Sequence, residues 1–136
     1  MSSSLTAGDV LAPKTFTITR ADLVAYAGAS GDQNPIHQDE DVATSVGLPG
    51  VIAHGMYTLA LVGRAVAEWT DGAEVVDLGA KFTSPVVVPA EGGAEVVVAG
   101  TVKSVADGLA TLALEVTCDG QKVLGMPKAV VKHAGA

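Results

Sequence analysis

The stretch from Gly55 to Trp69 constrains the fold most, because it predicts a helix that is apolar over most of its circumference. Its broad apolar side comprises Met56, Leu59, Ala60, Gly63, Val66 and Ala67, and Leu61 and Val62 lie beside it. Only Tyr57, Arg64 and Glu68 form a polar stripe. Such a helix is normally wrapped by other structure. Gly63 weakens it by about 1 kcal/mol relative to Ala, which predicts a backbone passing close by.

The second half of the chain consists of valine-rich runs that predict strands. They cover residues 74–84, 94–105, 110–118 and 121–132. Asp107-Gly108 and Asp119-Gly120 separate the last three runs, and Asp-Gly is a strong signal for a tight hairpin. We therefore expect an antiparallel meander of four long strands. Pro127 predicts a bulge or an edge position in the last strand.

The first half of the chain predicts shorter elements. Residues 1–14 are expected to be irregular, and residues 15–19 to form a short strand that adds to the sheet. Thr19 and Asp22 match a capping box for a helix that ends near Gly28. A second short helix begins at residues 39–41 and stops at residues 47–50. Its three acidic residues are interpreted as complementing the helix dipole, and no metal site is expected there.

Together these elements predict an α+β fold, with an antiparallel sheet of five to six strands wrapped around a central helix. The length of 136 residues and the apolar content of 49% fit one domain over residues 1–136. Such a sheet leaves edges and an apolar outer patch, which pairing with a second copy would cover.

Composition excludes several classes of function. The formal net charge of −7 argues against binding to nucleic acid or to anionic membranes. No apolar run is long enough to cross a bilayer, and the first residues do not resemble a signal peptide, so a cytoplasmic protein is expected. The single Cys118 cannot form an internal disulfide and is interpreted as a small apolar strand residue. If the ligand is attached to an anionic carrier, a local basic patch or a partner subunit must supply the positive charge that binds it.

Asp32 and His37 lie close together in a segment that contains Gly28, Gly31, Asn34 and Pro35. Such a segment is poor at forming a helix or strand but suited to a fixed loop. Asp32 alone could cap a turn, and His37 alone could be a structural histidine. Together, and near a helix that begins with glycine, they favour a pair of proton-transfer groups.

Gly55 and Asn34 complete the predicted site. The Gly55 N–H is one of the unpaired donors at the start of the central helix, and the missing side chain lets a reacting group approach. Asn34 is predicted to fix the loop through a local bond from its side chain to the backbone.

The segment Ser30–His37 (SGDQNPIH), followed by Ala43 and by Ala53–Met56 (AHGM), resembles the motif of the MaoC-like, (R)-specific enoyl-thioester hydratases and dehydratases. Within that family the chain is most similar to the catalytic beta subunits of the mycobacterial-type 3-hydroxyacyl-carrier-protein dehydratase of type II fatty acid synthesis. The resemblance implies a hotdog fold, catalytic Asp32 and His37, support from Asn34, and an oxyanion contact from the Gly55 backbone.

The implied reaction is the reversible dehydration of an (R)-3-hydroxyacyl thioester to a trans-2-enoyl thioester, with no metal and no other cofactor. In hydration Asp32 would take a proton from water while His37 protonates C2, and a mechanism in which one residue handles both protons stays open. Ser30, Gly31, His54 and Tyr57 are predicted to bind substrate. His54 is equally explained as a residue that preorganises the loop, and Tyr57, like Tyr26, by core packing.

Two other functions stay open, because related folds host different chemistries. One is an acyl thioesterase. The other is a non-catalytic hotdog subunit that pairs with an active partner, although the presence of both Asp32 and His37 speaks against it. The substrate carrier is either coenzyme A or an acyl carrier protein, and the chain is expected to form a homodimer or a heterodimer with a related hotdog subunit.

Overall fold

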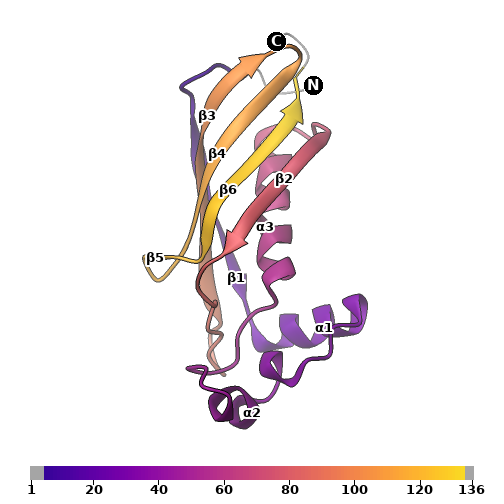
Figure 1. The fold of residues 1–136 in the computed structure, drawn as a ribbon, viewed down its shortest axis with the longest axis vertical. Helices are drawn as coiled ribbons and strands as arrows, with labels where there is room; N and C mark the ends of the chain where they lie inside the picture. The colour runs from indigo at the N-terminus through magenta and orange to yellow at the C-terminus, as the bar shows by residue number, and fades with distance from the viewer. Residues whose placement is uncertain (1–4, 134–136) are drawn as a thin grey trace.

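The computed structural model describes residues 5–133, in which a six-stranded antiparallel sheet packs against one long helix (Figure 1). In chain order the elements are β1 (Val10–Ile18), α1 (Arg20–Ser30), the 3-10 helix η1 (Pro35–His37), α2 (Glu40–Ser45), α3 (Gly55–Trp69), β2 (Val75–Phe82), β3 (Ala94–Ala106), β4 (Leu109–Cys118), β5 (Gln121–Lys122) and β6 (Leu124–Lys132). The predicted α+β architecture is confirmed.

The strands lie in the order β1-β3-β4-β6-β2, with the short β5 paired to β4. Both predicted hairpins are present: Asp107 and Gly108 have φ of 54° and 77°, and Asp119 and Gly120 have φ of 53° and 77°, as a type I′ turn requires. The predicted simple meander is wrong for β2, which pairs with β6 instead of β3. The segment 83–93 after β2 is too long for a tight turn and carries the chain across to β3.

Strand β1 begins earlier than predicted, at Val10 instead of Thr15. The predicted irregular lead-in is therefore wrong for residues 10–14. Pro13 is accommodated because β1 is an edge strand and its pairing with β3 shifts register between Leu11 and Lys14. The bulge predicted at Pro127 is also present. The register between β2 and β6 shifts between Gly79 and Lys81, and Met126, next to Pro127, has φ of 48°.

Helix α1 has the predicted capping box, in which Thr19 and Asp22 exchange hydrogen bonds between side chain and backbone. It ends at Ser30, two residues beyond the predicted Gly28. Gly31 supplies the left-handed cap with φ of 80°, and its N–H donates to the carbonyl of Ala27. The left-handed conformation favours glycine, so the position of this cap sets where the loop begins.

Helix α3 has the predicted bounds, but its buried face differs from the predicted apolar side. The side chains buried against the sheet are Thr58, Val62, Ala65, Val66 and Trp69, whereas Met56, Ala60 and Ala67 are exposed. A helix that is apolar nearly all round does not reveal by periodicity which side meets the sheet. The backbone expected near Gly63 is also absent, since a Cβ there would meet only the Leu78 side chain, at 3.6 Å.

The core of the sheet follows the predicted alternation. In β4, Leu112, Leu114, Val116 and Cys118 are buried, and the intervening residues are more exposed. Burial, followed by the nearby Asp119 carboxylate, raises the pKa of the Cys118 thiol. Cys118 is therefore a buried apolar strand residue, as the sequence predicted.

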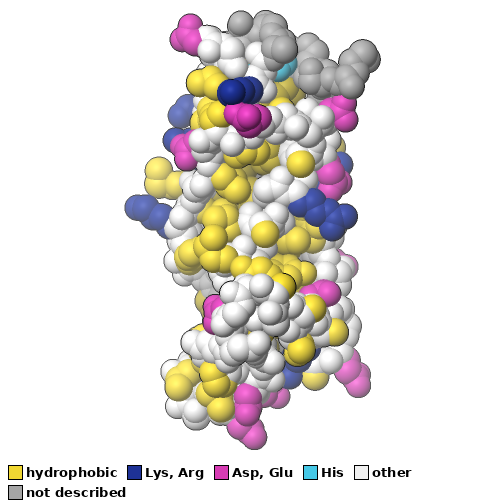
Figure 2. All heavy atoms as spheres, turned by 90° about the vertical axis from the view of Figure 1, so that its right-hand side faces the viewer, with side chains coloured by type: hydrophobic (Ala, Val, Ile, Leu, Met, Phe, Trp, Pro, Cys, Tyr) yellow, Lys and Arg dark blue, Asp and Glu magenta, His cyan; other side chains and the backbone are white. Residues whose placement is uncertain are grey.

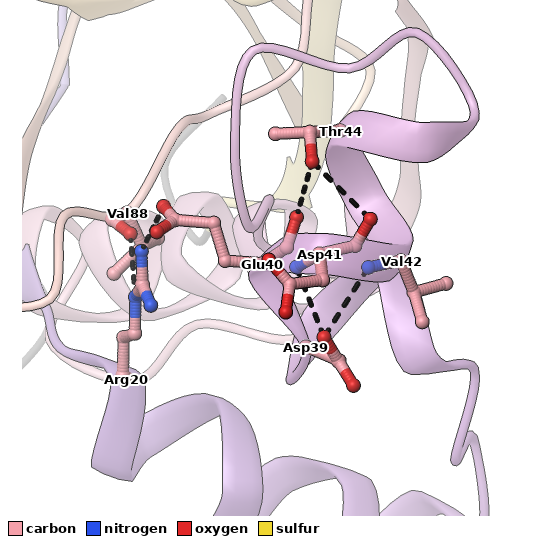
Figure 3. Close-up of polar contacts among 7 residues, drawn as sticks. All are labelled: Arg20, Asp39, Glu40, Asp41, Val42, Thr44 and Val88. Atoms are coloured by element: carbon pink, nitrogen blue, oxygen red, sulfur yellow. Dashed lines mark hydrogen bonds and ion pairs between the residues drawn. The ribbon is translucent and has the colours of Figure 1, made fainter.

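A polar network holds the small helix α2 against the rest of the chain (Figure 3). Arg20 donates from Nε to the carbonyl of Val88 and from Nη2 to Glu40, both at 2.9 Å. Asp39 caps α2 by accepting the N–H groups of Asp41 and Val42. The acidic residues at the start of α2 thus serve helix capping and a bridge to α1, in agreement with the sequence interpretation.

The face that carries α3 and the edge strand β2 leaves hydrophobic side chains uncovered (Figure 2). Exposed fractions are 58% for Met56, 45% for Val76 and 57% for Phe82. Strand β2 is at the end of the sheet, so one row of its backbone groups has no strand beside it within the described residues. Among residues 5–133, no helix is long and apolar enough to span a bilayer.

Candidate active site

Local hydrogen bonds shape the loop between α1 and η1. The N–H of Asp32 donates to the Ser30 hydroxyl at 3.1 Å, and the N–H of Asn34 donates to the Asp32 carboxylate at 3.3 Å. Asn34 in turn accepts the N–H of Ile36 at 3.2 Å and caps the 3-10 helix. The predicted bond between the Asn34 side chain and the loop backbone is present. The turn orients Asp32, which is exposed on the loop.

His37 is the last residue of η1 and is buried, with 7% of its surface exposed. Its Nδ1–H donates to the carbonyl of Ile52 at 2.7 Å. Because a carbonyl only accepts, this bond assigns the proton of the neutral ring to Nδ1 and leaves Nε2 with a free lone pair. His37 is thus oriented as a proton acceptor.

Gly55 is the first residue of α3, so its N–H has no acceptor within the helix. Within the described residues no other backbone carbonyl accepts from it. A Cβ built at Gly55 would lie 2.9 Å from the ring of Phe82. Glycine therefore allows the Phe82 ring to approach the start of α3 closely.

Asp32, His37, His54 and Gly55 line one cavity of about 420 Å³. The rest of its wall is mostly apolar and comprises Ile52, Ala53, Met56, Thr58, Phe82, Thr83, Ser84, Pro85, Val86, Val123 and Leu124. The structure thus brings together residues from the loop, the start of α3 and the end of β2. A carboxylate, an imidazole and a helix N-terminus face the same space.

Four other predicted site residues do not line this cavity. Ser30, Gly31 and Asn34 make their described contacts within the loop. Tyr57 packs edge-on against Tyr26, with ring centroids 5.1 Å apart. Burial, then the carboxylate of Asp22, raises the pKa of Tyr57, and Arg64 acts in the opposite direction. Substrate contacts of Ser30, Gly31 and Tyr57, and a catalytic role of Asn34, stay predictions.

The sequence interpretation missed the wall formed by residues 82–86. This segment lies opposite the start of α3, where Phe82 faces Gly55. It carries no acid, imidazole or thiol that would mark it chemically. The only available signal was its turn composition directly after a strand.

Asp32, His37 and His54 are the group within residues 5–133 that could hold a metal ion, since one ligand atom from each lies within 4.8 Å of the others. The rings of His37 and His54, however, stack with centroids 3.8 Å apart and planes 22° apart. Their lone pairs therefore lie in nearly parallel planes and do not converge on one point.

Comparison with known proteins matches residues 3–119 to the family model described as MaoC like domain. The chain is 42% identical over 77 residues to 3-hydroxyacyl-thioester dehydratase X of Mycobacterium tuberculosis, covering 56% of this chain and 26% of that protein. The chain spans about a quarter of the length of the first two curated relatives it matches.

Solved structures match over nearly the whole chain. A protein described as a MaoC-like dehydratase superposes with a TM-score of 0.91 at 34% identity, over 96% of this chain and 41% of that one. The (R)-hydratase from A. caviae involved in PHA biosynthesis superposes with a TM-score of 0.85 at 26% identity, over 96% of this chain and 98% of that one. The predicted hotdog fold is confirmed, and so is the resemblance on which it was based.

Proposed function

This chain belongs to the MaoC-like domain family, and from that premise we propose that it catalyses the reversible dehydration of (R)-3-hydroxyacyl thioesters to trans-2-enoyl thioesters. The observation that carries the proposal is that Asp32, His37 and the N-terminus of α3 line one largely apolar cavity. An apolar wall suits an acyl chain, and the polar groups suit the two proton transfers that the reaction needs. We also propose that residues 1–136 belong to one domain.

The free lone pair of His37 Nε2 fits the first step of dehydration. His37 takes the proton from C2 of the substrate, the C3–O bond breaks, and protonated Asp32 gives its proton to the leaving hydroxyl, which departs as water. The electron pair from the C2–H bond forms the new double bond. Hydration runs the same steps backwards: the Asp32 carboxylate takes a proton from water as its oxygen attacks C3, and the His37 imidazolium protonates C2.

Negative charge develops on the thioester oxygen when the C2 proton is removed. We propose that the Gly55 N–H stabilises this charge, because this donor is unpaired within the described residues and belongs to the positive end of α3. This gives the third group of the site a role that neither Asp32 nor His37 can fill.

Gly55→Pro and Gly55→Ala test this role as a pair. Proline is tolerated at the first position of a helix, and His54 has φ of −59° and ψ of 133°, which suit the residue before proline. Both variants press on Phe82, but only Gly55→Pro removes the N–H. We expect kcat to fall by about a hundred- to a thousand-fold for Gly55→Pro relative to Gly55→Ala. Equal kcat in the two folded variants would contradict an oxyanion contact at this atom.

The substrate carrier and the partner belong to the same proposal. Within the described residues Lys14, Arg20, Arg64, Lys128 and Lys132 are engaged in ion pairs. Few positive charges are therefore left for an anionic carrier such as coenzyme A or an acyl carrier protein. The open edge of β2 and the exposed Met56 and Phe82 fit a second hotdog subunit, identical or related, that covers this face. A cytoplasmic location stays a prediction of the sequence.

Assay of the purified chain with crotonyl-coenzyme A, with its mass measured on the same sample, tests the function. We expect the absorbance of the enoyl thioester to fall while no free thiol appears. Release of thiol would indicate a thioesterase. A folded chain that turns over nothing alone but becomes active with a related subunit would support the heterodimer. Activity of that complex that survives Asp32→Asn in this chain would indicate a non-catalytic partner. A mass of twice the chain, with activity, would support a homodimer.

A further inference from the structure

His54 contacts each of the three groups assigned to the reaction. It donates from Nε2 to the backbone carbonyl of Asp32 at 3.1 Å. Its ring stacks on that of His37, with centroids 3.8 Å apart. It also precedes Gly55 in the chain and is the N-cap residue of α3, yet its side chain makes no capping bond. One side chain therefore links the loop, the 3-10 helix and the start of α3.

The hydrogen-bond pattern of His54 is unusual for a buried group. Only 1% of its surface is exposed. Because its partner is a carbonyl, the proton of the neutral ring lies on Nε2 and Nδ1 carries a lone pair. That Nδ1 atom is buried without a hydrogen-bond partner among the described residues. An unsatisfied buried acceptor is costly, so each such atom in a folded protein calls for an explanation.

We propose that His54 is a positioning residue, which holds the Asp32 backbone through Nε2–H and supports the His37 ring by stacking, so that both face the cavity. Asp32 is on an exposed loop, where its other described bonds are local. The bond from His54 crosses from the buried start of α3 and links this loop to the central helix. The effect of His54 on kcat rests on the proposed function, whereas its contacts with Asp32 and His37 do not.

Tyr26 contacts the same ring, with its centroid 4.7 Å from that of His54 and a tilt of 58°. His54 is thus held between an aromatic ring from α1 and the imidazole from η1. This packing fixes the ring plane, so the direction of the Nε2–H bond is set before substrate binds. Preorganisation of this kind affects kcat more than substrate affinity.

His54→Phe and His54→Gln separate the two contacts. Phe keeps a flat ring for stacking but has no donor, whereas Gln places an amide N–H near the position of Nε2 but has no ring. If the bond to Asp32 is the main link, His54→Phe should lower kcat with crotonyl-coenzyme A by about ten- to a hundred-fold at nearly unchanged KM, and His54→Gln should recover most of it. His54→Phe removes the unsatisfied Nδ1 acceptor but also the donor to the Asp32 carbonyl, so the melting temperatures of both variants are measured to confirm that both are folded. Equal kcat in His54→Phe and wild type would overturn the proposal, as would equal losses in both variants.

A measurement on the protein without substrate tests the contact itself. In long-range ¹⁵N–¹H spectra of the wild type, His54 should show a protonated Nε2 and a bare Nδ1. The amide of Gln33, which follows the Asp32 carbonyl, should shift in His54→Phe and return toward its wild-type position in His54→Gln. A protonated Nδ1, or a Gln33 amide that does not respond, would overturn the contact even if the chain proved inactive as a hydratase. An inactive wild type with these spectral features would count against the proposed function alone.

Discussion

Asp32→Asn is expected to lower kcat for crotonyl-coenzyme A hydration by about a hundred- to ten-thousand-fold, the usual contribution of a general acid or base. Asn has the same shape as Asp, and its side-chain oxygen can still accept the N–H of Asn34, which the Asp32 carboxylate accepts at 3.3 Å. The loop should therefore keep its conformation. What is lost is the ability to take a proton from water and return it.

Asp41→Asn is the matched control for this variant. Asp41 is another exposed aspartate in the same half of the chain, and its described hydrogen bonds involve only its backbone. It should retain wild-type kcat. Asp32→Asn should unfold at the same denaturant concentration as the wild type, whereas Asp41→Asn should unfold at a slightly lower one, because it removes a charge from the first turn of α2. Retention of most activity in Asp32→Asn would remove Asp32 from the mechanism and leave a single residue to move both protons.

His37→Asn is expected to cause a loss of similar size, about a hundred- to ten-thousand-fold in kcat. The Asn amide can occupy the place of Nδ1 and donate to the carbonyl of Ile52, which His37 contacts at 2.7 Å. The substitution therefore removes Nε2, the atom that would exchange a proton with C2. It keeps the bond between η1 and the segment that precedes α3. His37→Ala should lose stability as well, because the Ile52 carbonyl then loses its donor.

His133→Asn controls for the loss of an imidazole elsewhere. His133 accepts the N–H of Leu5 at 3.4 Å and does not line the cavity. It should show wild-type kcat.

Exchange of deuterium from solvent into C2 of the substrate adds a direct readout of the C2 step. It should be slowed in His37→Asn in proportion to kcat. Exchange at the wild-type rate in that variant would assign the C2 proton to another group.

Much of the site could be predicted because its parts are close in sequence. Asp32, Asn34 and His37 lie between the end of α1 and the end of η1, so the turn chemistry of Gly31, Asn34 and Pro35 alone indicated a fixed arrangement. The start of α3 at Gly55 followed from its composition and is confirmed. That Gly55 lies beside Asp32 and His37 could not follow from the sequence without the family resemblance. Local patterns do not fix the path of residues 38–54, and this path sets where α3 begins in space.

The strand errors have a common physical origin. Asp-Gly turns act locally, so the hairpins at residues 107–108 and 119–120 were predictable. The pairing of β2 with β6, in contrast, joins strands about 50 residues apart and depends on which apolar faces fit together. Likewise, Pro13 lies in a strand because β1 is at the edge of the sheet, a fact that no local pattern contains.

The sequence by itself predicted most of the helices and strands, both hairpins, the capping of α1 and two candidate proton-transfer residues, since each depends on contacts between residues a few positions apart. Only the tertiary structure decided which side of α3 is buried, which residues form the far wall of the cavity, and that His54 joins Asp32 to His37. These depend on packing between segments distant in the chain. An apolar helix or a histidine offers several acceptable surroundings, and the fold selects one of them.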